Sequence, residues 1–457
     1  MANLILWSCS FHKTIPMRPV ACYQLASWLR YHGYTVKVIE FCHLMPPSVL
    51  ADITEKYIDS ETLAIGVSAS FWSHRELNDT SEPQWVVDAR TIIDRRHKLP
   101  WLLGGSVTGN KLNLDWLKFY GFAEDSLLKW MDENSSKLIR RELFSEQKII
   151  KSFIDNDFVR PGDVIPIELG RGCQFKCRFC SFPLIGKKKG TYLRDFNLIK
   201  DEFLENYERW GVTNYQFLDD TVNESEEKII ALADMVQSLP FKLQWVGYNR
   251  LDLIWSRPGT IQALKDSGLR SAFFGIESFH PVASAAVGKG WNGKYAKDFL
   301  LKLKNEWGKD ITWTMGMIAG LPGEDLQSVR DSLQWCIDNE MYDYNFVPLN
   351  LDISKDKLWK SEFEREYAKW GYSFIGDSDI EWKNDIVSFR DVSTLCNEIR
   401  DEAFKHIKIA AWYLCAFTGL GYTFEELQHK RRCDIEYGDL LRRTNEKIRN
   451  YMEYQLR

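Results

Sequence analysis

Three cysteines fall within eight residues directly after a predicted β-strand. Cys173, Cys177 and Cys180 have the spacing CxxxCxxC. Thiolates are the ligands that iron–sulfur clusters and zinc select. Gly170 and Gly172, just before the first cysteine, allow the chain to wrap closely around a bound group. The spacing therefore predicts a metal centre at the end of a strand.

Zinc is the first alternative for this centre. Closed zinc sites usually take four ligands. The next cysteine along the chain is Cys336, and no histidine lies between His97 and His280. Three thiolates on a four-iron cluster leave one iron open to a chelating substrate. The sequence therefore favours a 4Fe–4S cluster, with a zinc protein as the alternative.

The charge balance excludes some classes of partner. The 457 residues carry a net charge of −5, which indicates neither nucleic acid nor an anionic membrane as a partner. The basic run 187–189, followed by Tyr192 and Arg194, either steers an anionic substrate or is a solvated loop.

The remaining cysteines are dispersed, as expected for buried thiols: Cys9, Cys22, Cys42, Cys336, Cys396, Cys415 and Cys433. The first residues read as a strand without the features of a signal peptide, so we expect a cytoplasmic protein. The uncharged segment 409–424 is short for a bilayer, and we expect a buried helix that ends at its glycines.

Residues 1–131 alternate strand and helix patterns. Strands are expected at 4–7, 35–41, 63–70 and 101–105, and helices at 21–32 and 83–96. This alternation predicts a Rossmann-like domain with a parallel sheet, whose ligands lie at the carboxyl ends of the strands. The small residues there form either ordinary turns or a ligand site: Ser68, Ser70, Gly104 and Gly105.

A second α/β region follows a charged stretch, 132–162, that is expected to be a helical linker. In region 163–354, strands are predicted at 164–169, 214–219, 242–248, 271–277, 311–318 and 342–349. The intervening helices are predicted at 198–210, 226–238, 260–267, 295–307 and 325–339. Six such units form a partial (β/α)6 barrel of the TIM type, with its functional face at the strand ends. Region 355–457 is expected to be a mostly helical cap.

The cysteine run, including Phe179 before its last cysteine, closely resembles the signature of the radical SAM superfamily. The resemblance implies that the open iron binds the amino and carboxylate groups of S-adenosylmethionine (SAM). It also implies that an electron from the cluster cleaves SAM to a 5′-deoxyadenosyl radical. Cys173, Cys177 and Cys180 are then the metal ligands and the catalytic centre, and a reductant such as flavodoxin or ferredoxin is a partner.

Later strand ends resemble the superfamily's SAM-holding motifs. Asp219 and Asp220 are similar to the segment that contacts the SAM amino group, although a helix N-cap also explains such residues. Glu277 and Ser278 resemble the ribose-binding strand end. A salt bridge is the other explanation for a buried glutamate.

Three further segments complete the implied SAM site. Arg250 closes the third strand and either neutralises a carboxylate or is a plain surface arginine. Met317 and Gly320 belong to a segment that resembles the superfamily's turn near the adenine. Leu349, at the end of the sixth strand, would complete the adenine pocket through backbone groups.

The order of the three regions resembles the cobalamin-binding radical SAM family. Segment 23–34 is similar to that family's first helix, and Gly104 and Gly105 stand where its fourth strand ends in paired glycines. The Asp-x-His-x-x-Gly motif that supplies a lower cobalt ligand in many cobalamin proteins is absent, because Phe41 and Pro46 replace its first and last residues. The resemblance implies that cobalamin binds at the loops with Ser68, Ser70, Gly104 and Gly105.

With cobalamin, the implied reaction is methyl transfer to an unactivated carbon or phosphorus centre. Without it, the alternatives are isomerisation, carbon–carbon bond formation or cleavage, and methylthiotransferase-like chemistry. The last needs three further cluster cysteines, and Cys9, Cys22 and Cys42 lie too close together for that pattern. A non-enzymatic alternative is an iron–sulfur or zinc protein that binds a partner through its aromatic-rich tail.

Overall fold

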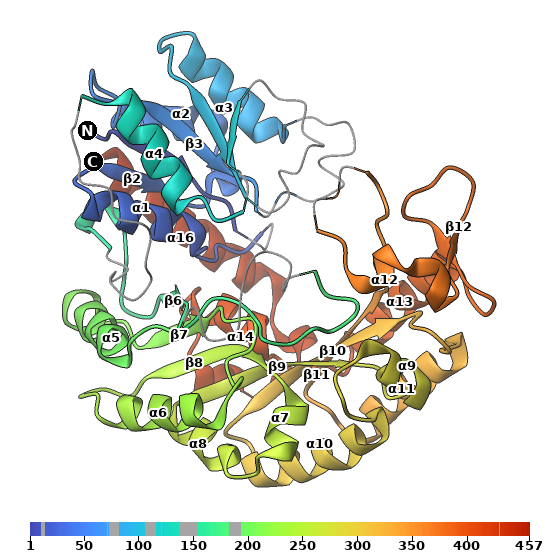
Figure 1. Cartoon of the computed structure of the whole chain (residues 1–457). Coiled ribbons are helices and arrows are strands. Elements are labelled where there is room, and N and C mark those ends of the chain that lie inside the picture. The colour runs from blue at the N-terminus through green and yellow to red at the C-terminus, as the bar shows by residue number, and fades with distance from the viewer. Residues whose placement is uncertain are drawn as a thin grey trace.

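The chain folds into two α/β units joined by a largely helical C-terminal region (Figure 1). The computed structural model describes residues 1–10, 14–70, 72, 82–105, 116–119, 121–136, 153–181, 193–355, 357, 359–428 and 430–457. In Figure 1 the N-terminal unit, in blue, lies above the second unit, in green to orange. The predicted α/β class is confirmed.

The N-terminal sheet is parallel, with the strand order β2-β1-β3-β4-β5. Its strands are β1 (Leu4–Trp7), β2 (Val36–Ile39), β3 (Ala64–Ser68), β4 (Trp101–Gly104) and β5 (Leu117–Phe119). The helical segments are α1 (Ala21–Tyr31), η1 (Cys42–Leu44), α2 (Pro47–Glu55), α3 (Gln84–Asp94) and α4 (Glu124–Asn134). The Rossmann-like prediction is confirmed, and the order reverses between β1 and β3, where such folds bind ligands.

The second sheet has the strand order β11-β10-β9-β8-β7-β6, and every pairing is parallel. Its strands are β6 (Val164–Ile167), β7 (Asn214–Phe217), β8 (Gln244–Asn249), β9 (Leu269–Glu277), β10 (Thr312–Ala319) and β11 (Asp343–Pro348). Its helices are α5 (Phe196–Trp210), α6 (Glu226–Gln237), α7 (Leu251–Ser256), α8 (Thr260–Asp266), α9 (Pro281–Val287), α10 (Gly293–Trp307) and α11 (Leu326–Asp338). The six predicted βα units are all present.

Local capping explains where the barrel helices begin and end. The side chain of Asp195 accepts a hydrogen bond from the backbone N–H of Asn197 at the start of α5, and Gly211 ends that helix with φ +67°. Asp325 and Ser328 form a capping box at the start of α11. Several strands end one or two residues before their predicted ends, so the functional side chains lie on loops at the edge of the sheet.

The C-terminal region contacts both units. It contains α12 (Glu362–Arg365), η4 (Tyr367–Trp370), β12 (Ser373–Phe374), β13 (Trp382–Lys383), α13 (Phe389–Ala403), α14 (Ala411–Thr418), α15 (Phe424–Leu427), η5 (Arg432–Asp434) and α16 (Tyr437–Leu456). The apolar helix α14 contacts β6, β8, β9 and β10, which shows that the second sheet curls around it. Among the described residues, no helix is long and apolar enough to cross a membrane.

The structure shows how the C-terminal helix and the connecting segment pack. Helix α16 does not cap the barrel, because its Ile448 and Tyr451 are buried in the core of the N-terminal unit. Of the expected helical linker, 132–162, the structure describes 132–136, where α4 ends at Asn134, and 153–162, which contains the short turn η2 (Asp155–Asp157). Phe153 and Asp157 are buried, whereas most of 153–162 is partly or fully exposed, so a few side chains attach this segment to the fold.

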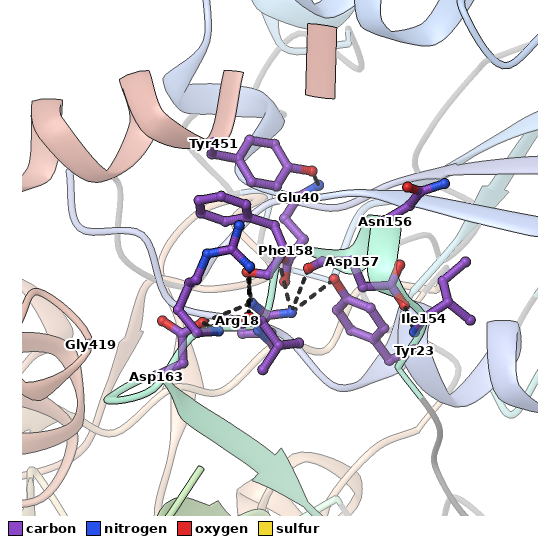
Figure 2. Close-up of polar contacts among 12 residues, drawn as sticks. Arg18, Tyr23, Glu40, Ile154, Asn156, Asp157, Phe158, Asp163, Gly419 and Tyr451 are labelled. Carbon is purple, nitrogen blue, oxygen red and sulfur yellow. Dashed lines mark hydrogen bonds and ion pairs between the residues drawn. The ribbon is translucent and has the colours of Figure 1, made fainter. Parts of the chain in front are cut away.

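A buried ionic cluster around Arg18 fastens these segments together (Figure 2). The guanidinium lies 3.3 Å from Glu40, at the end of β2, and 3.2 Å from Asp163, at the start of the barrel. It also donates to the carbonyl oxygen of Asp157 at 3.2 Å. Lys447 of α16 forms an ion pair with Asp163 at 2.8 Å. One arginine thus joins the N-terminal unit, the connecting segment and the barrel, and Asp163 links it to the C-terminal helix.

Burial changes the proton affinity of this cluster. Burial raises the pKa of the Glu40 carboxyl to about 7, although the charge of Arg18 lowers it. Burial would also raise the pKa of Asp163, but Lys447 and Arg18 lower it below its usual value. The folded chain therefore holds Asp163 ionised and takes up a proton at Glu40 near neutral pH.

We expect Glu40→Gln to flatten the pH dependence of stability. The pKa of Glu40 is higher in the folded than in the unfolded chain, so its contribution is complete below about pH 4.5 and is lost as the pH rises to about 7. That loss is on the order of 3 kcal/mol. Urea unfolding between pH 5 and pH 8 measures it, and parallel profiles for the variant and the wild type would contradict the expectation.

Candidate active site

The three clustered cysteines lie on the loop that leaves β6 at the carboxyl edge of the barrel sheet. All three are partly exposed, whereas Cys433 is exposed and the other six cysteines are buried. The backbone N–H of Cys180 donates to the carbonyl of Cys177 at 3.0 Å, which forms a tight turn between two of the thiols. Gly172, before Cys173, has φ +104°. These thiols are accessible to a metal, as reactive cysteines must be.

Asp219 holds the start of the cysteine loop against the neighbouring strand. Its carboxylate accepts hydrogen bonds from the backbone N–H groups of Leu169 at 2.8 Å and Gly170 at 2.9 Å. It also pairs with Lys228 of α6 at 2.8 Å, and both side chains are buried. Burial alone would lower the pKa of Lys228, but Asp219 and Glu224 raise it. Asp219 therefore positions the loop.

Two polar side chains approach the sulfur atoms. Oγ1 of Thr221 lies 3.5 Å from Sγ of Cys173, and Nη1 of Arg250 donates to Sγ of Cys177 at 3.6 Å. Asp252 holds the guanidinium of Arg250 through two hydrogen bonds of 3.0 and 2.7 Å. Arg250 is therefore part of the cysteine site, and the alternative of a plain surface arginine is wrong.

Positive charge surrounds Cys177. Burial raises the pKa of the Cys177 thiol, while Lys289 and Arg250 lower it. The guanidinium of Arg250 also lies 3.9 Å from the ring centroid of Phe175, within the cysteine loop. Since only the thiolate binds iron, two nearby cations favour the ligand form. Hydrogen bonds to sulfur are one means by which a protein sets the potential of a cluster.

Three thiolates are one ligand short of a closed zinc site. Across the described ranges, no three His, Cys, Asp or Glu side chains are arranged to hold one metal ion. Zinc would require four ligand atoms, each roughly 2.3 Å or less from one point. In a four-iron cluster each thiolate binds a different iron, so its three ligands stand further apart. Three accessible thiols on one loop are available for such a cluster.

Glu277 ends β9 in a strained conformation beside this loop. Its φ is +68°, and the pairing register with β10 shifts at this point. The side chain folds back over Gly275, where an added Cβ would clash with the carboxylate. Lys289 pairs with the carboxylate at 2.7 Å, so the salt bridge that the sequence offered as an alternative is present. Such strain is typical of ligand sites, and the predicted ribose contact stays a prediction.

Ser278 and Gly320 are linked through a buried glutamate. The hydroxyl of Ser278 donates to Oε1 of Glu324 at 2.5 Å, and the N–H of Gly320 donates to Oε2 at 3.1 Å. Burial raises the pKa of Glu324 to about 7, although these hydrogen bonds lower it. Glu324 therefore fixes the ends of β9 and β10 relative to one another.

The predicted adenine side of the site is covered by the C-terminal region. Tyr372 donates to the carbonyl of Gly320 at 2.8 Å, and Trp382 donates to the carbonyl of Leu349 at 2.8 Å. Met317 is buried within β10, two residues before the end of that strand. Sequence reasoning missed the two aromatic residues, because nothing in their spacing indicates which strand end they contact.

The remaining predicted residues lie in different surroundings, from the edge of the cysteine loop to the protein core. Asp220 is partly exposed beside the loop, and Phe179 packs against the main core. Arg194 is buried and pairs with Glu202 at 2.7 Å, so it does not steer a substrate. The basic run 187–189 and Tyr192 lie outside the described residues.

A pocket of about 250 Å³ lies at the carboxyl ends of β1, β3, β4 and β5. The four residues that were predicted to form ligand loops, Ser68, Ser70, Gly104 and Gly105, all line it. An added Cβ at Gly105 would lie 2.6 Å from the backbone nitrogen of Ser70, whereas one at Gly104 would meet nothing within 4 Å. Most of the lining is apolar, including Leu6, Val20, Leu25, Val67, Leu102 and Leu127. An apolar pocket with few polar groups suits an organic ligand.

Charged residues that sequence reasoning missed line this pocket beside the barrel. Arg171 pairs with Glu124 of α4 at 2.9 Å and with Glu168 at 3.1 Å. Its guanidinium lies 4.3 Å from the ring centroid of Phe122. All four residues line the pocket, and Arg171 stands two positions before Cys173. The pocket therefore borders the cysteine loop itself.

Among the described residues of the N-terminal unit, the other candidate ligands do not form a second metal centre. Among the described residues that line the pocket there is no histidine, and His43 lies 3.3 Å from Ser10 instead. Cys9, Cys22 and Cys42 are buried. Burial raises the pKa of Cys22 to about 11, and that of Cys42 well above its usual value, so both are thiols.

Residues 167–336 match the Radical SAM superfamily. The matched segment begins in β6 and includes all three cysteines and the ends of β7, β8, β9 and β10. The chain therefore contains a radical SAM domain, and the resemblance found in the cysteine run is confirmed.

Two curated relatives are similar to parts of the chain. An uncharacterized methyltransferase of Pyrococcus horikoshii is 24% identical over 190 residues, which cover 42% of this chain and 40% of that protein. The bacteriochlorophyllide d C-12(1)-methyltransferase of Chlorobaculum tepidum is 26% identical over 131 residues, 28% of each chain. The chain thus matches less than half the length of either relative.

Solved structures extend the likeness to nearly the whole chain. The radical SAM methyltransferase TsrM of Kitasatospora setae, with cobalamin and a 4Fe–4S cluster bound, superposes with a TM-score of 0.63 at 14% identity. That match covers 98% of this chain and 100% of TsrM. The cobalamin-dependent radical SAM enzyme OxsB gives a TM-score of 0.57 at 15% identity, over 81% of this chain and 55% of OxsB. Both chains therefore share the fold of this protein.

We expect Cys173→Ala, Cys177→Ala and Cys180→Ala each to lose nearly all bound iron after anaerobic reconstitution. Each substitution removes one of only three thiolates near the barrel edge. Cys396→Ala and Cys433→Ala are the matched controls and should retain the iron, because these cysteines lie elsewhere. Iron and sulfide analysis with absorption spectra measures the outcome, and a cluster retained in all three site variants would contradict it.

We expect Asp219→Asn to destabilise the barrel by about 3 kcal/mol, because it removes the buried one of the two carboxylates that pair with Lys228 and leaves Glu224, which is more exposed. The amide would also meet one of the two loop N–H groups with a donor. Urea unfolding and the rate of iron loss measure both effects. Asp220→Asn, the neighbouring and more exposed carboxylate, is the control. Equal behaviour of the two variants would show that Asp219 does not hold the loop.

Proposed function

We propose that this chain is a cobalamin-dependent radical SAM methyltransferase. The observation that carries the proposal is the juxtaposition of three accessible thiols on the barrel edge with an apolar pocket at the carboxyl ends of the Rossmann-like sheet. Arg171, in the same loop as the thiols, is part of the pocket wall. A site for radical chemistry and a site for a carrier group are thus adjacent.

The bound groups would supply an electron, a 5′-deoxyadenosyl radical and a methyl carrier. The chain supplies the ligands and their setting. Cys173, Cys177 and Cys180 bind iron as thiolates, and Arg250 places positive charge beside the sulfur of Cys177. Asp219 keeps the loop in register with β7.

The strand ends would hold SAM. Glu277, 7% exposed and aimed by Lys289, is assigned to the ribose hydroxyls. Asp220 is assigned to the SAM amino group, since Asp219 already accepts from two loop N–H groups. Gly320 and Leu349 are assigned to the adenine side, which Tyr372 and Trp382 cover.

The N-terminal pocket would hold part of cobalamin. Its volume of about 250 Å³ is below the usual range for drug-sized ligands, so a corrinoid would enter only in part. Gly104 leaves space at the strand end, and no histidine is among the described lining residues. We therefore assign cobalamin binding without a histidine ligand from this pocket. The two relatives named as methyltransferases support methyl transfer as the outcome.

We further propose that a one-electron donor such as flavodoxin or ferredoxin reduces the cluster, and that the protein acts in the cytoplasm. The cluster requires an electron for each cleavage, and the chain itself contributes no other redox group to the described site.

Anaerobic reconstitution followed by dithionite and SAM tests the first part of the proposal. The wild type should form 5′-deoxyadenosine, and Cys177→Ala should form none. An intact cluster that yields no 5′-deoxyadenosine and no methylated product would favour a non-catalytic iron–sulfur protein.

Protein produced with hydroxocobalamin tests the second part. The corrinoid absorption band should remain with the protein through gel filtration. A bulky residue at the open glycine, Gly104→Leu, should weaken retention about ten-fold or more by filling the pocket. A colourless wild type that still cleaves SAM would favour the cobalamin-independent radical reactions.

A further inference from the structure

Arg171 is placed to connect the pocket with the cysteine loop. It lies between Gly170 and Gly172, so the backbone on both sides is conformationally free. Its side chain, 9% exposed in the whole residue, extends out of the barrel to Glu124, the first residue of α4. The stretch is thus held in two ways, by the hydrogen bond from the N–H of Gly170 to Asp219 and by a side chain anchored in the other unit.

The anchor has the geometry of a strong charged contact. Nη1 of Arg171 donates to Glu124 at 2.9 Å, while Nε and Nη2 face the two oxygens of Glu168 at 3.4 and 3.1 Å. The forked arrangement fixes the orientation of the guanidinium plane. Phe122 lies against one face of that plane. A shift of α4 would therefore move Arg171, and with it the residues on either side.

The strength of the ion pairs around Arg171 depends on whether a ligand or water occupies the pocket. Glu124, Glu168 and Arg171 all line it, so one cation faces two carboxylates at its wall. A ligand that displaces water there lowers the local dielectric and strengthens both ion pairs. It also restricts the guanidinium to the position seen here. Since Cys173 is two residues away, the same restriction stiffens the first cluster ligand.

We propose that Arg171 is a positioning residue that couples occupancy of the N-terminal pocket to the retention of the cluster by the cysteine loop. This inference rests on the proposed binding of cobalamin and iron. The coupling is reciprocal by thermodynamic necessity: if pocket binding stabilises the iron-loaded loop, iron loading strengthens pocket binding by the same factor.

The rate of iron removal by a chelator measures the coupling. Full-length, iron-reconstituted protein is mixed with bathophenanthroline under reducing conditions, with and without saturating hydroxocobalamin. In the wild type, hydroxocobalamin should slow iron release by roughly five-fold or more. In Arg171→Met, at a hydroxocobalamin concentration raised until the variant is saturated, the two rates should agree within about two-fold.

A matched control and a second variant make the test specific. Arg178→Met removes another arginine of the same loop, which pairs with Glu362 at 3.3 Å and does not line the pocket. It should keep the full protection. Glu124→Gln leaves Arg171 and the loop intact but weakens the anchor, and should reduce protection at least two-fold. If Arg171→Met does not take up iron, the iron release of Glu124→Gln tests the coupling instead.

The outcomes separate this inference from the proposed function. Protection that persists in Glu124→Gln and Arg171→Met would overturn the coupling while leaving cobalamin binding intact. The coupling would also be overturned if the wild type binds hydroxocobalamin but releases iron no more slowly. If Arg171→Met loses the corrinoid while protection in Glu124→Gln is unchanged, Arg171 only lines the pocket and the coupling is overturned. A wild type that binds no corrinoid would overturn the inference together with the cobalamin part of the proposal.

Discussion

The buried contact between Asp219 and the start of the cysteine loop is the interaction on which the site depends. The carboxylate satisfies two backbone N–H groups at the end of β6 and balances the charge of Lys228. Removing any one of these leaves a polar group unsatisfied in the low dielectric of the core, which costs several kcal/mol. Because Thr221 follows two residues later and reaches Cys173, the same contact also sets the first thiol. A metal site on a loop needs this kind of support, since the loop backbone has little structure of its own.

Periodicity predicted most of the two sheets, and spacing predicted a loop with three cysteines at the end of the first barrel strand. Alternating strand and helix patterns are properties of single segments, so they can be read from a sequence. The role of Asp219 could not be read in this way. Two adjacent aspartates after a strand look equally suited to a ligand or to a helix N-cap, and only the packing of β6 against β7 shows which one faces inward. Lys289 and Arg171 gave no signal, because their partners are distant in the chain or lie in the other unit.

The C-terminal region was the least predictable for the same reason. The pattern of α16 indicates a helix with one apolar face, but not the surface on which that face packs. Tyr451 and Ile448 of this helix complete the N-terminal core, and Lys447 enters the cluster around Arg18. Arg18, Glu40 and Asp163 would each be costly to bury alone. The cost of burying each charge is offset only when its partners from the other segments are in place. The cluster therefore stabilises one relative arrangement of the two units.

That arrangement gives the pocket its chemical character. In an isolated Rossmann-like domain, the carboxyl ends of the strands would open to water, and a small apolar hollow there would bind an organic ligand weakly. Here the loop that leaves β6 closes one side with Glu168 and Arg171, and the pocket acquires charged groups that belong to the barrel. Among the described residues of the wall, both carboxylates pair with the guanidinium of Arg171. The side chains that join the two units therefore also form the polar part of the pocket wall.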